Sequence, residues 1–359
     1  MKVGILGGGQ LALMMVDSFI DKNVEFIVLD PSDKPPASKR VKCIKAKYDD
    51  TEYLDFLAKE CDVVTIDFEN VPSSSLNYLE KQTKVYPNSK SVEICQDRLK
   101  EKNLFRECGV PVTDFYEIND IDDLKNAVSE ITNKSILKSR FMGYDGKNQV
   151  HLNDKKIEEA FTLCGSKDLI LEKKVDFITE LSLIGARTQD GDTVYYPLVE
   201  NNHNNGILDY SIAPYENEEL QKKAEEYHRV LCDKMNYVGI LVIEFFLINN
   251  QELIANEMAP RVHNSGHWTI EGANISQFEA HIRCIINEQI SDIEMNKYSG
   301  MVNIISKMPK DKAEGLSDIS GFHDYGKLER ENRKLGHITL IDTNKNNLLK
   351  KIENIKKII

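Results

Sequence analysis

The sequence predicts an α/β domain with a parallel sheet, followed by an α+β region that fills the rest of the chain. Two observations support this prediction. As far as Pro87, short apolar strands alternate with helical stretches, whereas after about residue 110 short strands are joined by turns that contain Gly and Asn. The length of 359 residues fits two or three domains of roughly 100–200 residues each. We therefore expect three segments, at 1–98, 99–290 and 291–359.

The N-terminal segment has the element order of a Rossmann-like parallel sheet. Lys2–Leu6 predicts a buried strand, and three glycines then turn the chain into a helix. Further strands are expected at 25–30, 41–46 and 62–68, and helices near 51–60 and 73–82. A charged helix over 91–108 is expected to follow, with Asp97 and Arg98 near its middle.

The later segments contain shorter strands and two amphipathic helices. Strands are expected at 135–138, 168–175, 182–186, 193–199, 301–307 and 337–342. One long helix is expected over 217–235. The C-terminal helix carries an apolar stripe at helical spacing, formed by Leu348, Leu349, Ile352, Ile355 and Ile359. This stripe predicts either core packing or a subunit contact.

The composition is that of a globular protein, and it excludes some functions. Hydrophobic residues make up 41% of the chain and charged residues 29%, and the formal net charge is −12. A chain this acidic is a poor candidate for binding nucleic acid or an anionic membrane nonspecifically. The longest later apolar run, 239–248, is about half a membrane span. We therefore expect neither nucleic acid nor a membrane as a partner.

Seven scattered cysteines form no CxxC pattern and predict neither a zinc site nor a disulfide framework. Reduced thiols, and hence a cytoplasmic location, are the simplest interpretation. The N-terminus has a Lys and an apolar run, as a signal peptide has, but three glycines and Gln10 interrupt the run.

The glycines near the N-terminus fit two interpretations. Gly7-x-Gly9-x-x-Ala12 follows a strand and opens a helix, and Asp30 stands where a ribose-binding acid belongs. The pattern therefore keeps a nicotinamide-dependent oxidoreductase open as an alternative. Free N–H groups at a helix N-terminus attract any anion, so the pattern predicts an anion site with or without a dinucleotide. A tight turn alone is the structural alternative.

Lys138 ends a predicted strand and is followed by a glycine loop. A Lys can pair with nucleotide phosphates as a point charge, and the backbone N–H groups of a glycine loop can close over them. The loop lacks the GK[ST] sequence of a Walker A motif, and an ordinary hairpin turn is the alternative. Its residues are Gly143, Tyr144, Asp145, Gly146, Lys147, Asn148 and Gln149.

A predicted hairpin of 239–248 and 252–258 carries the strongest signal. A two-residue turn at 250–251 fixes the register of the two strands. Counting outward gives the pairs Asn249–Glu252, Leu247–Ile254, Phe245–Asn256 and Glu244–Glu257. A slip of one residue would move every side chain to the other face.

In this register the carboxylates of Glu244 and Glu257 lie side by side, at roughly 5 Å between Cβ atoms. Two carboxylates on an apolar face must share a proton or hold a cation. Oxygen ligands without a nearby His or Cys favour Mg²⁺, bound together with substrate phosphates. Two unrelated surface glutamates are the alternative. The same face is expected to hold Val242, Phe246, Ile248, Leu253 and Ala255.

Two polar clusters follow the hairpin. Residues 261–268 (RVHNSGHW) bring together an Arg, two His, an Asn, a Ser and the only Trp, which predicts a substrate-binding loop. Residues 327–334 (KLERENRK) form a local basic run in an acidic chain. This run either binds a phosphate or is a solvated loop.

Six motifs occur in an order that is typical of one family. They are GGGQL at 7–11, DFENV at 67–71, QDRLKEK at 96–102, LKSRFMGYDGKNQ at 137–149, ENNHNNGILDYSIAP at 200–214 and NEMAPRVHNSGHW at 256–268. Over nearly its whole length the chain resembles the 5-(carboxyamino)imidazole ribonucleotide synthases, ATP-grasp ligases of bacterial de novo purine (IMP) biosynthesis. The resemblance implies a Rossmann-like N-terminal domain, an ATP-grasp fold, a small β-rich C-terminal domain and a homodimer. In this family ATP and bicarbonate form carboxyphosphate, and the exocyclic amine of 5-aminoimidazole ribonucleotide becomes a carbamate.

The resemblance assigns one group of residues to ATP and its metal. Arg98, Lys138 and the loop of residues 143–149 would contact the phosphates. Glu180 would hold the ribose hydroxyls, and His203 would line the nucleotide pocket. The adenine-binding strand would consist of Glu172, Lys173, Lys174 and Val175. The metal site would consist of Glu244 and Glu257, with Asn256 beside them, and would take Mg²⁺ or, in its place, Mn²⁺.

The resemblance assigns a second group to the other two substrates. Arg261, His263 and Asn264 would take part in the chemistry of bicarbonate or carboxyphosphate, and Ser265 and Gly266 would complete that loop. The ribonucleotide would be lined by Gln10, Leu11 and Glu69, with its 5′-phosphate on Lys327 and Arg333.

Three alternatives remain open at this point. One is another ATP-grasp ligase that acts on a related ribonucleotide, which the HNSGHW motif and the basic run disfavour. A nicotinamide-dependent oxidoreductase would leave the paired glutamates unexplained and would bind NADH. A non-catalytic nucleotide-binding regulator would not need Lys138, Glu244 and Glu257 intact.

Overall fold

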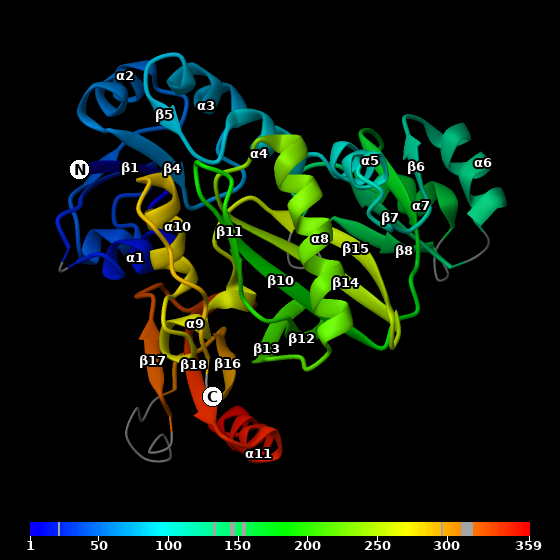
Figure 1. Cartoon of the computed structure of the whole chain (residues 1–359). Helices are drawn as coiled ribbons and strands as arrows, with labels where there is room; N and C mark the ends of the chain where they lie inside the picture. Colours follow the sequence, from blue (N-terminus) through cyan, green and yellow to red (C-terminus); the bar gives the residue numbers. More distant parts are fainter. Residues whose placement is uncertain (21, 132–133, 144–147, 153–155, 296, 310–318) are drawn as a thin grey trace.

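The computed structural model describes the chain except for residues 21, 132–133, 144–147, 153–155, 296 and 310–318. A large antiparallel sheet occupies the middle of the molecule (Figure 1). The N-terminal parallel sheet lies on one side of it, and a smaller antiparallel sheet lies on the other side. Among the helices described, none is both long enough and apolar enough to cross a lipid bilayer.

The N-terminal unit is the predicted parallel sheet, with strand order β3-β2-β1-β4-β5. Its strands are β1 (Lys2–Leu6), β2 (Glu25–Asp30), β3 (Cys43–Lys45), β4 (Val63–Ile66) and β5 (Lys84–Val85). Its helices are α1 (Gln10–Asp17), the 3₁₀ helix η1 (Pro36–Lys39), α2 (Thr51–Glu60) and α3 (Ser73–Glu80). Helix α2 begins where expected because the Asp50 side chain accepts a hydrogen bond from Glu52 N–H as its N-cap.

The prediction of a single helix over 91–108 is wrong. The chain forms two helices, α4 (Ser89–Gln96) and α5 (Arg98–Glu107), which meet at Asp97. Asp97 is extended (φ −121°, ψ 106°), and its side chain accepts a hydrogen bond from Leu99 N–H as the N-cap of α5. The guanidinium of Arg140 holds the same carboxylate through two nitrogens, at 3.0 and 2.6 Å. Arg98 is therefore the first residue of a helix, where its side chain can reach the neighbouring strands.

The smaller antiparallel sheet has strand order β6-β9-β7-β8. Its strands are β6 (Phe115–Ile118), β7 (Ser135–Ser139), β8 (Gln149–His151) and β9 (Leu169–Lys173). Helices α6 (Ile121–Ile131) and α7 (Ile157–Leu163) pack against it through a separate apolar core. The predicted strands at 135–138 and 168–175 are confirmed, although β9 ends two residues earlier.

The central sheet has strand order β15-β14-β10-β12-β13-β16-β18-β17, with β11 paired to β10. Its first strands are β10 (Thr179–Arg187), β11 (Thr193–Tyr195), β12 (Val199–Asn204), β13 (Ile207–Ala213), β14 (Gly239–Asn249) and β15 (Glu252–Ala259). The C-terminal strands are β16 (Tyr298–Ile305), β17 (Gly321–Asp324) and β18 (Lys334–Asp342). The single strand expected at 193–199 is two strands, and the C-terminal strands join the central sheet because β16 pairs with β13.

Four helices and a 3₁₀ turn accompany the central sheet. They are α8 (Glu218–Met235), η3 (Asn264–Gly266), α9 (Thr269–Gly272), α10 (Gln277–Ile285) and α11 (Lys345–Lys356). The predicted stripe of α11 is part of the core, since Leu348, Ile352 and Ile355 are buried among residues of β16 and β18.

Helix α10 joins the N-terminal unit to the central sheet. His281 on α10 accepts a hydrogen bond from Ile240 N–H at its Nδ1 (3.1 Å) and lies 2.8 Å from Thr65 Oγ1 at its Nε2. Burial lowers the pKa of His281 to about 4, so the ring is neutral and its Nε2–H donates to Thr65. This contact fixes β4 of the parallel sheet beside β14 of the central sheet.

Candidate active site

The hairpin of β14 and β15 brings Glu244 and Glu257 opposite each other, as predicted. The register between them and the turn differs from the predicted one. A bulge with the extra residue Ile248 on β14 shifts the register by one residue, and a second bulge with the extra residue Asn256 on β15 restores it. The predicted partners Leu247–Ile254 and Phe245–Asn256 are wrong. The observed pairs in this stretch are Leu247–Leu253, Phe246–Ile254 and Phe245–Ala255.

The bulges change which side chains accompany the carboxylates. Leu253 and Ala255 belong to the apolar core that also holds Phe245 and Leu247, and not to the face of Glu244 as expected. The extra residue at Asn256 then returns Glu257 to the face of Glu244, because it shifts the alternation of side chains by one. The carboxylate pair therefore depends on an irregularity that the counting did not include.

His263 contacts Glu244 and fixes its environment. His263 Nδ1 accepts a hydrogen bond from Ser265 N–H, so the neutral ring carries its proton on Nε2, which lies 3.1 Å from Glu244 Oε1. Burial holds the pKa of His263 well below its usual value. Burial, together with the charge of Glu257, raises the pKa of Glu244 to about 7. A carboxylate in this position is stabilised near neutral pH by a proton or a cation.

Glu180 and His203 lie beside Glu244. Single ligand atoms of Glu180, His203 and Glu244 lie within 4.8 Å of one another, and His203 Nδ1 is 3.1 Å from Glu180 Oε2. Burial lowers the pKa of His203, but the contact with Glu180 and the charge of Glu244 outweigh it and raise that pKa. The strands β10, β12 and β14 thus bring together three of the residues that the resemblance assigned to nucleotide and metal. The prediction of oxygen ligands without a nearby His is wrong, since His203 and His263 both lie beside Glu244. The carboxylates of Glu180 and Glu244 nevertheless suit a Mg²⁺ ion that also binds phosphate oxygens.

Lys138 and Glu172 form a buried ion pair on the smaller sheet. Lys138 Nζ lies 2.9 Å from Glu172 Oε2, and Lys102 Nζ lies 3.5 Å from the same oxygen. Burial raises the pKa of Glu172, but the charges of Lys102, Lys138 and Arg98 outweigh it and lower that pKa to about 2. The other oxygen, Glu172 Oε1, is buried without a hydrogen-bond partner. The site therefore has an excess of cations next to an unsatisfied acceptor, which suits a bound nucleotide.

Arg98 connects this group to the metal-binding hairpin. Its Nη1 lies 3.0 Å from Glu257 Oε2, and its Nη2 donates to Gly143 O at 3.2 Å. Of the glycine loop, Gly143, Asn148 and Gln149 are described, and Tyr144, Asp145, Gly146 and Lys147 lie outside the described residues. Gln149 begins β8 and pairs with Lys138 on β7.

The residues expected to read adenine lie at the end of β9. Glu172 and Lys173 are the last residues of the strand, and Lys174 and Val175 follow it. Lys173 points to the surface, where its Nζ lies 3.6 Å from Asp114. The Oε2 atom of Glu172 is held by the two lysines, so its Oε1 atom and the backbone of this stretch remain for recognition of a base.

A cleft of about 530 Å³ brings together half of the predicted site residues that the structure describes. Those that line it are Gln10, Leu11, Glu69, Arg98, Gly143, Glu244, Glu257, Arg261, His263, Asn264, Lys327 and Arg333. The other predicted residues that the structure describes lie outside its lining, namely Lys138, Asn148, Gln149, Glu172, Lys173, Lys174, Val175, Glu180, His203, Asn256, Ser265 and Gly266.

On one side of the cleft an ion pair joins the N-terminal unit to the loop after β15. Arg261 Nε donates to Glu69 Oε2, and Arg261 Nη1 donates to Val262 O at 2.9 Å. The pKa of Arg261 is raised because the charge of Glu69 outweighs the burial that lowers it. A guanidinium that stays charged beside this cleft can attract an anion.

The backbone N–H groups at the glycine turn bind carboxyl groups of the protein itself. Gly8 N–H donates to Asp30 (2.8 Å) and Ala12 N–H lies 3.4 Å from Asp67, so these acids occupy the start of α1. A Cβ at Gly7, whose φ is +101°, would overlap the Asp67 carboxylate. The carboxyl groups of Asp30 and Asp67 therefore fill the anion site predicted at this turn, and Gly7 makes room for Asp67 rather than for a pyrophosphate. The basis of the nicotinamide alternative is removed.

The basic run before β18 does line the cleft. Lys327 and Arg333 are joined there by Arg330 and Lys334, which the sequence analysis did not single out although they belong to the same run. Burial, followed by the charge of Arg333, lowers the pKa of Lys327 to about 8. Four basic side chains around one cleft favour phosphate binding over the alternative of a solvated loop.

Part of the loop of residues 261–268 lines the cleft, and the rest of it is buried in the core. Asn264 forms a reciprocal amide pair with Asn303, at 3.0 and 2.7 Å. Ser265 and Gly266 are buried, and a Cβ at Gly266 would meet the Gln277 side chain at 2.6 Å. Ser265 therefore acts on the site through His263, and Gly266 allows close packing.

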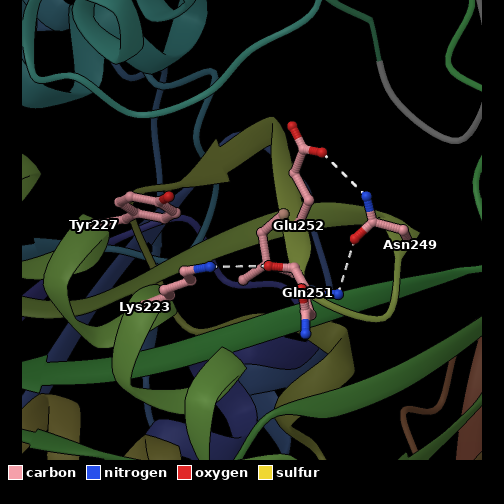
Figure 2. Close-up of a pocket in the computed structure, with 6 residues that line it drawn as sticks. Lys223, Tyr227, Asn249, Gln251 and Glu252 are labelled. Atoms are coloured by element: carbon pink, nitrogen blue, oxygen red, sulfur yellow. Dashed lines mark hydrogen bonds between the residues drawn. The ribbon is translucent and has the colours of Figure 1, made fainter.

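A second, smaller hollow lies at the turn between β14 and β15 (Figure 2). Lys223 Nζ donates to Gln251 O at 3.0 Å, and Gln251 N–H donates to Asn249 Oδ1 at 2.9 Å. Its lining contains none of the predicted site residues. It lies at the turn of the hairpin, away from the predicted site residues.

Comparisons with known proteins identify the family of the chain. The ribonucleotide synthetase preATP-grasp domain family matches residues 1–96, the ATP-grasp domain family matches 103–278, and the phosphoribosylaminoimidazole carboxylase C-terminal domain family matches 299–351. The chain is 40% identical to the N5-carboxyaminoimidazole ribonucleotide synthase of Pseudomonas aeruginosa, over 100% of this chain and 99% of that protein. It is 34% identical to the Staphylococcus aureus protein of the same name, over 96% and 93% of the two chains.

Solved structures show the same similarity. The synthetase from Thermus thermophilus superposes with a TM-score of 0.94 at 38% identity, over 99% of this chain and 98% of that one. The synthase from Aspergillus clavatus, in complex with ADP and 5-aminoimidazole ribonucleotide, superposes with a TM-score of 0.91 at 30% identity, again over 99% and 98%. The chain therefore belongs to the N5-carboxyaminoimidazole ribonucleotide synthase family and is an ATP-grasp ligase.

Proposed function

We propose that the chain carboxylates the exocyclic amine of 5-aminoimidazole ribonucleotide, using ATP and bicarbonate, in de novo purine biosynthesis. One observation carries this proposal. A single cleft is lined by the paired carboxylates Glu244 and Glu257 and also by a basic run that includes Lys327 and Arg333. The carboxylates suit a metal-bound nucleotide phosphate, and the basic run suits the 5′-phosphate of a ribonucleotide.

In the proposed reaction, an oxygen of bicarbonate attacks the γ-phosphorus of ATP, and ADP leaves. The product, carboxyphosphate, then delivers its carboxyl carbon to the amine, phosphate leaves, and the amine loses a proton. Arg261 lies in the cleft as a fixed cation that can bind bicarbonate and the carboxyphosphate formed from it. The closed cleft must exclude water, because carboxyphosphate hydrolyses readily.

Lys138 and Arg98 would bind the nucleotide phosphates, as the resemblance assigns them. Lys138 is held by Glu172, and Arg98 by Glu257, so neither side chain needs to be ordered when ATP binds. His263 lies in the cleft with its Nε2–H directed at Glu244, and it orients that carboxylate.

We propose Mg²⁺ as the metal, with Mn²⁺ able to substitute. Glu244 and Glu257 would hold it, and it would offset the charge on the transferring phosphoryl group. The raised pKa of Glu244, caused by burial and by the charge of Glu257, supports a cation at this place.

Three further expectations belong to the same proposal. The chain would act in the cytoplasm, where its seven cysteines, all free thiols in the structure, would stay reduced. It would form a homodimer, which light scattering coupled to size-exclusion chromatography measures directly. The segments 1–98, 99–290 and 291–359 would be its domains.

ADP release from Mg·ATP tests the function, with 5-aminoimidazole ribonucleotide and bicarbonate each added and omitted. We expect release that depends on the ribonucleotide, together with a labile carbamate that reverts on standing. Release that depends on a different amine would identify another ATP-grasp ligase. No release, with tight binding of NADH, would contradict the proposal altogether.

A further inference from the structure

Strand β15, which carries Glu257, is the outermost strand of the central sheet. The backbone groups on the open side of an edge strand need partners from elsewhere. Ala255 N–H donates to Pro111 O at 2.7 Å, in the segment that follows α5. The next groups along the strand are paired by side chains of α5 itself.

Two neighbouring residues of α5 hold the bulge of β15 on both sides. Lys102 Nζ donates to Asn256 O at 2.7 Å, and Glu101 Oε1 accepts from Met258 N–H at 2.5 Å. Arg98 Nη1 lies 3.0 Å from Glu257 Oε2. Residues 101 and 102 both lie about one turn after residue 98, on the same side of the helix. That face therefore contacts residues 256, 257 and 258 in succession.

Both of these residues are buried, since Lys102 is 1% exposed and Glu101 is 2% exposed. Burying a charged side chain is costly, and apolar residues would fill the same space at less cost. Space filling alone therefore does not account for these two side chains, and burial raises the pKa of Glu101 to about 8, so that its carboxyl group is largely protonated at neutral pH. The bonds to the backbone of 256 and 258 do account for the two side chains.

The bulge is what directs Glu257 into the site. Phe245 pairs with Ala255 while Glu244 pairs with Glu257, so Asn256 is the extra residue. Without this extra residue, side-chain alternation would place Glu257 on the face of Ala255, in the apolar core. Holding the carbonyl of Asn256 and the N–H of Met258 keeps the bulge in place.

Lys102 also contacts the other half of the site. Its Nζ lies 3.5 Å from Glu172 Oε2, the same oxygen that binds Lys138. One ammonium group thus connects the strand of the metal-binding carboxylate with the phosphate-binding Lys138.

We propose that Lys102 and Glu101 are positioning residues for Glu257, which hold the β15 bulge and so set the affinity of the site for the metal–nucleotide complex. This inference rests on the proposed function only in its assignment of Glu257 to the metal. Loss of such supporting contacts in metal sites typically lowers metal affinity about 10–100-fold.

Binding of Mn²⁺ to the enzyme–ADP complex, followed by electron paramagnetic resonance, tests the proposal without turnover. We expect Lys102→Met to weaken Mn²⁺ binding about 10-fold or more. The matched control is Lys100→Met on the same helix, whose ammonium pairs with Glu93 at the surface. Hydrogen–deuterium exchange should show faster exchange of residues 252–259 in Lys102→Met and not in the control.

Glu101 provides a second test if Lys102→Met does not fold. Glu101→Gln keeps an acceptor for Met258 N–H and should stay within about twofold of the wild type in Mn²⁺ affinity, whereas Glu101→Met should lose about 10-fold. A folded Lys102→Met or Glu101→Met with wild-type affinity would overturn the proposal.

Glu257→Gln separates this inference from the proposed function. If Glu257→Gln loses Mn²⁺ affinity and Lys102→Met does not, the positioning role is wrong and the metal assignment stands. If Glu257→Gln keeps the affinity, the metal assignment itself is wrong, and the positioning role is wrong with it.

Discussion

Removal of the Glu172 carboxylate should destabilise the fold by an amount that the structure defines. Glu172 is 3% exposed, and its Oε2 lies 2.9 Å from Lys138 Nζ and 3.5 Å from Lys102 Nζ. These cations outweigh the effect of burial and lower the pKa of Glu172 from 4.5 to about 2. At 1.36 kcal/mol for each unit of pKa, the shift of Glu172 corresponds to about 3 kcal/mol. Burial outweighs the ion pair at Lys138 and lowers the pKa of that side chain, so this value is an upper bound for the pair. This agrees with the roughly 3–5 kcal/mol lost when one partner of a buried pair is removed.

The pH dependence of this loss follows from the direction of the shift. Because the folded pKa of Glu172 is depressed, its contribution is fully present above pH 4.5 and disappears as the pH falls toward about 2. The difference in unfolding free energy between the wild type and Glu172→Gln should therefore be about 3 kcal/mol at pH 7. It should narrow by about 1 kcal/mol at pH 4.

Equilibrium unfolding in urea measures this difference, with the fluorescence of the buried Trp268 as the signal. The control is Glu93→Gln, which removes an exposed partner of Lys100 and should cost less than about 1 kcal/mol. ATP should restore part of the stability of Glu172→Gln, because its phosphates supply Lys138 with an anion. A difference below about 1 kcal/mol at pH 7 would refute the reasoning.

Three further predictions concern activity and pH. Glu257→Gln should abolish ADP release with the fold intact by circular dichroism, because one half of the carboxylate pair is lost, and retained activity would remove the metal assignment. The kcat/KM for the ribonucleotide should fall above about pH 8, because Lys327 then loses its proton. This fall should be absent in Lys327→Arg. If the pH profile of Lys327→Arg is the same as that of the wild type, Lys327 does not bind the phosphate. Burial lowers the pKa of both His228 and His281 from 6.5 to about 4, so each contributes stability above pH 6.5 and loses up to about 3 kcal/mol by pH 4. A Tm that stays constant from pH 7 to pH 5 would contradict this last prediction.

The paired glutamates were predictable from the sequence, although the intermediate steps were not. Counting from the turn placed Glu244 opposite Glu257, and the structure has this pair. The count succeeded because the extra residues Ile248 and Asn256 compensate each other. Alternation of apolar and polar side chains contains no information about bulges, so the residues between the turn and the pair were assigned to the wrong partners.

Other features could not be predicted from the sequence, because they depend on contacts between distant parts of the chain. Helical spacing continues across Asp97, and only its extended backbone and its bond to Arg140 show that one helix ends there. Lys102 looked like one more charged residue of a surface helix, because its burial depends on β15, which lies about 150 residues later. The glycine turn has the same sequence pattern whether it receives a pyrophosphate or the carboxylate of Asp67.

The continuity of the central sheet also determines which part of the cleft can move. The basic run leads directly into β18, and hydrogen-bonded strands connect β18 through β16, β13, β12 and β10 to β14. In the part of the chain that the structure describes, the sheet of β6 to β9 shares no strand pairing with that assembly. The sheet that carries Lys138 can therefore shift relative to the metal-binding carboxylates without breaking a strand pair of the central sheet, and so can the N-terminal parallel sheet that forms part of the cleft lining. The basic run and the metal-binding carboxylates, in contrast, are linked through the paired strands of one continuous sheet.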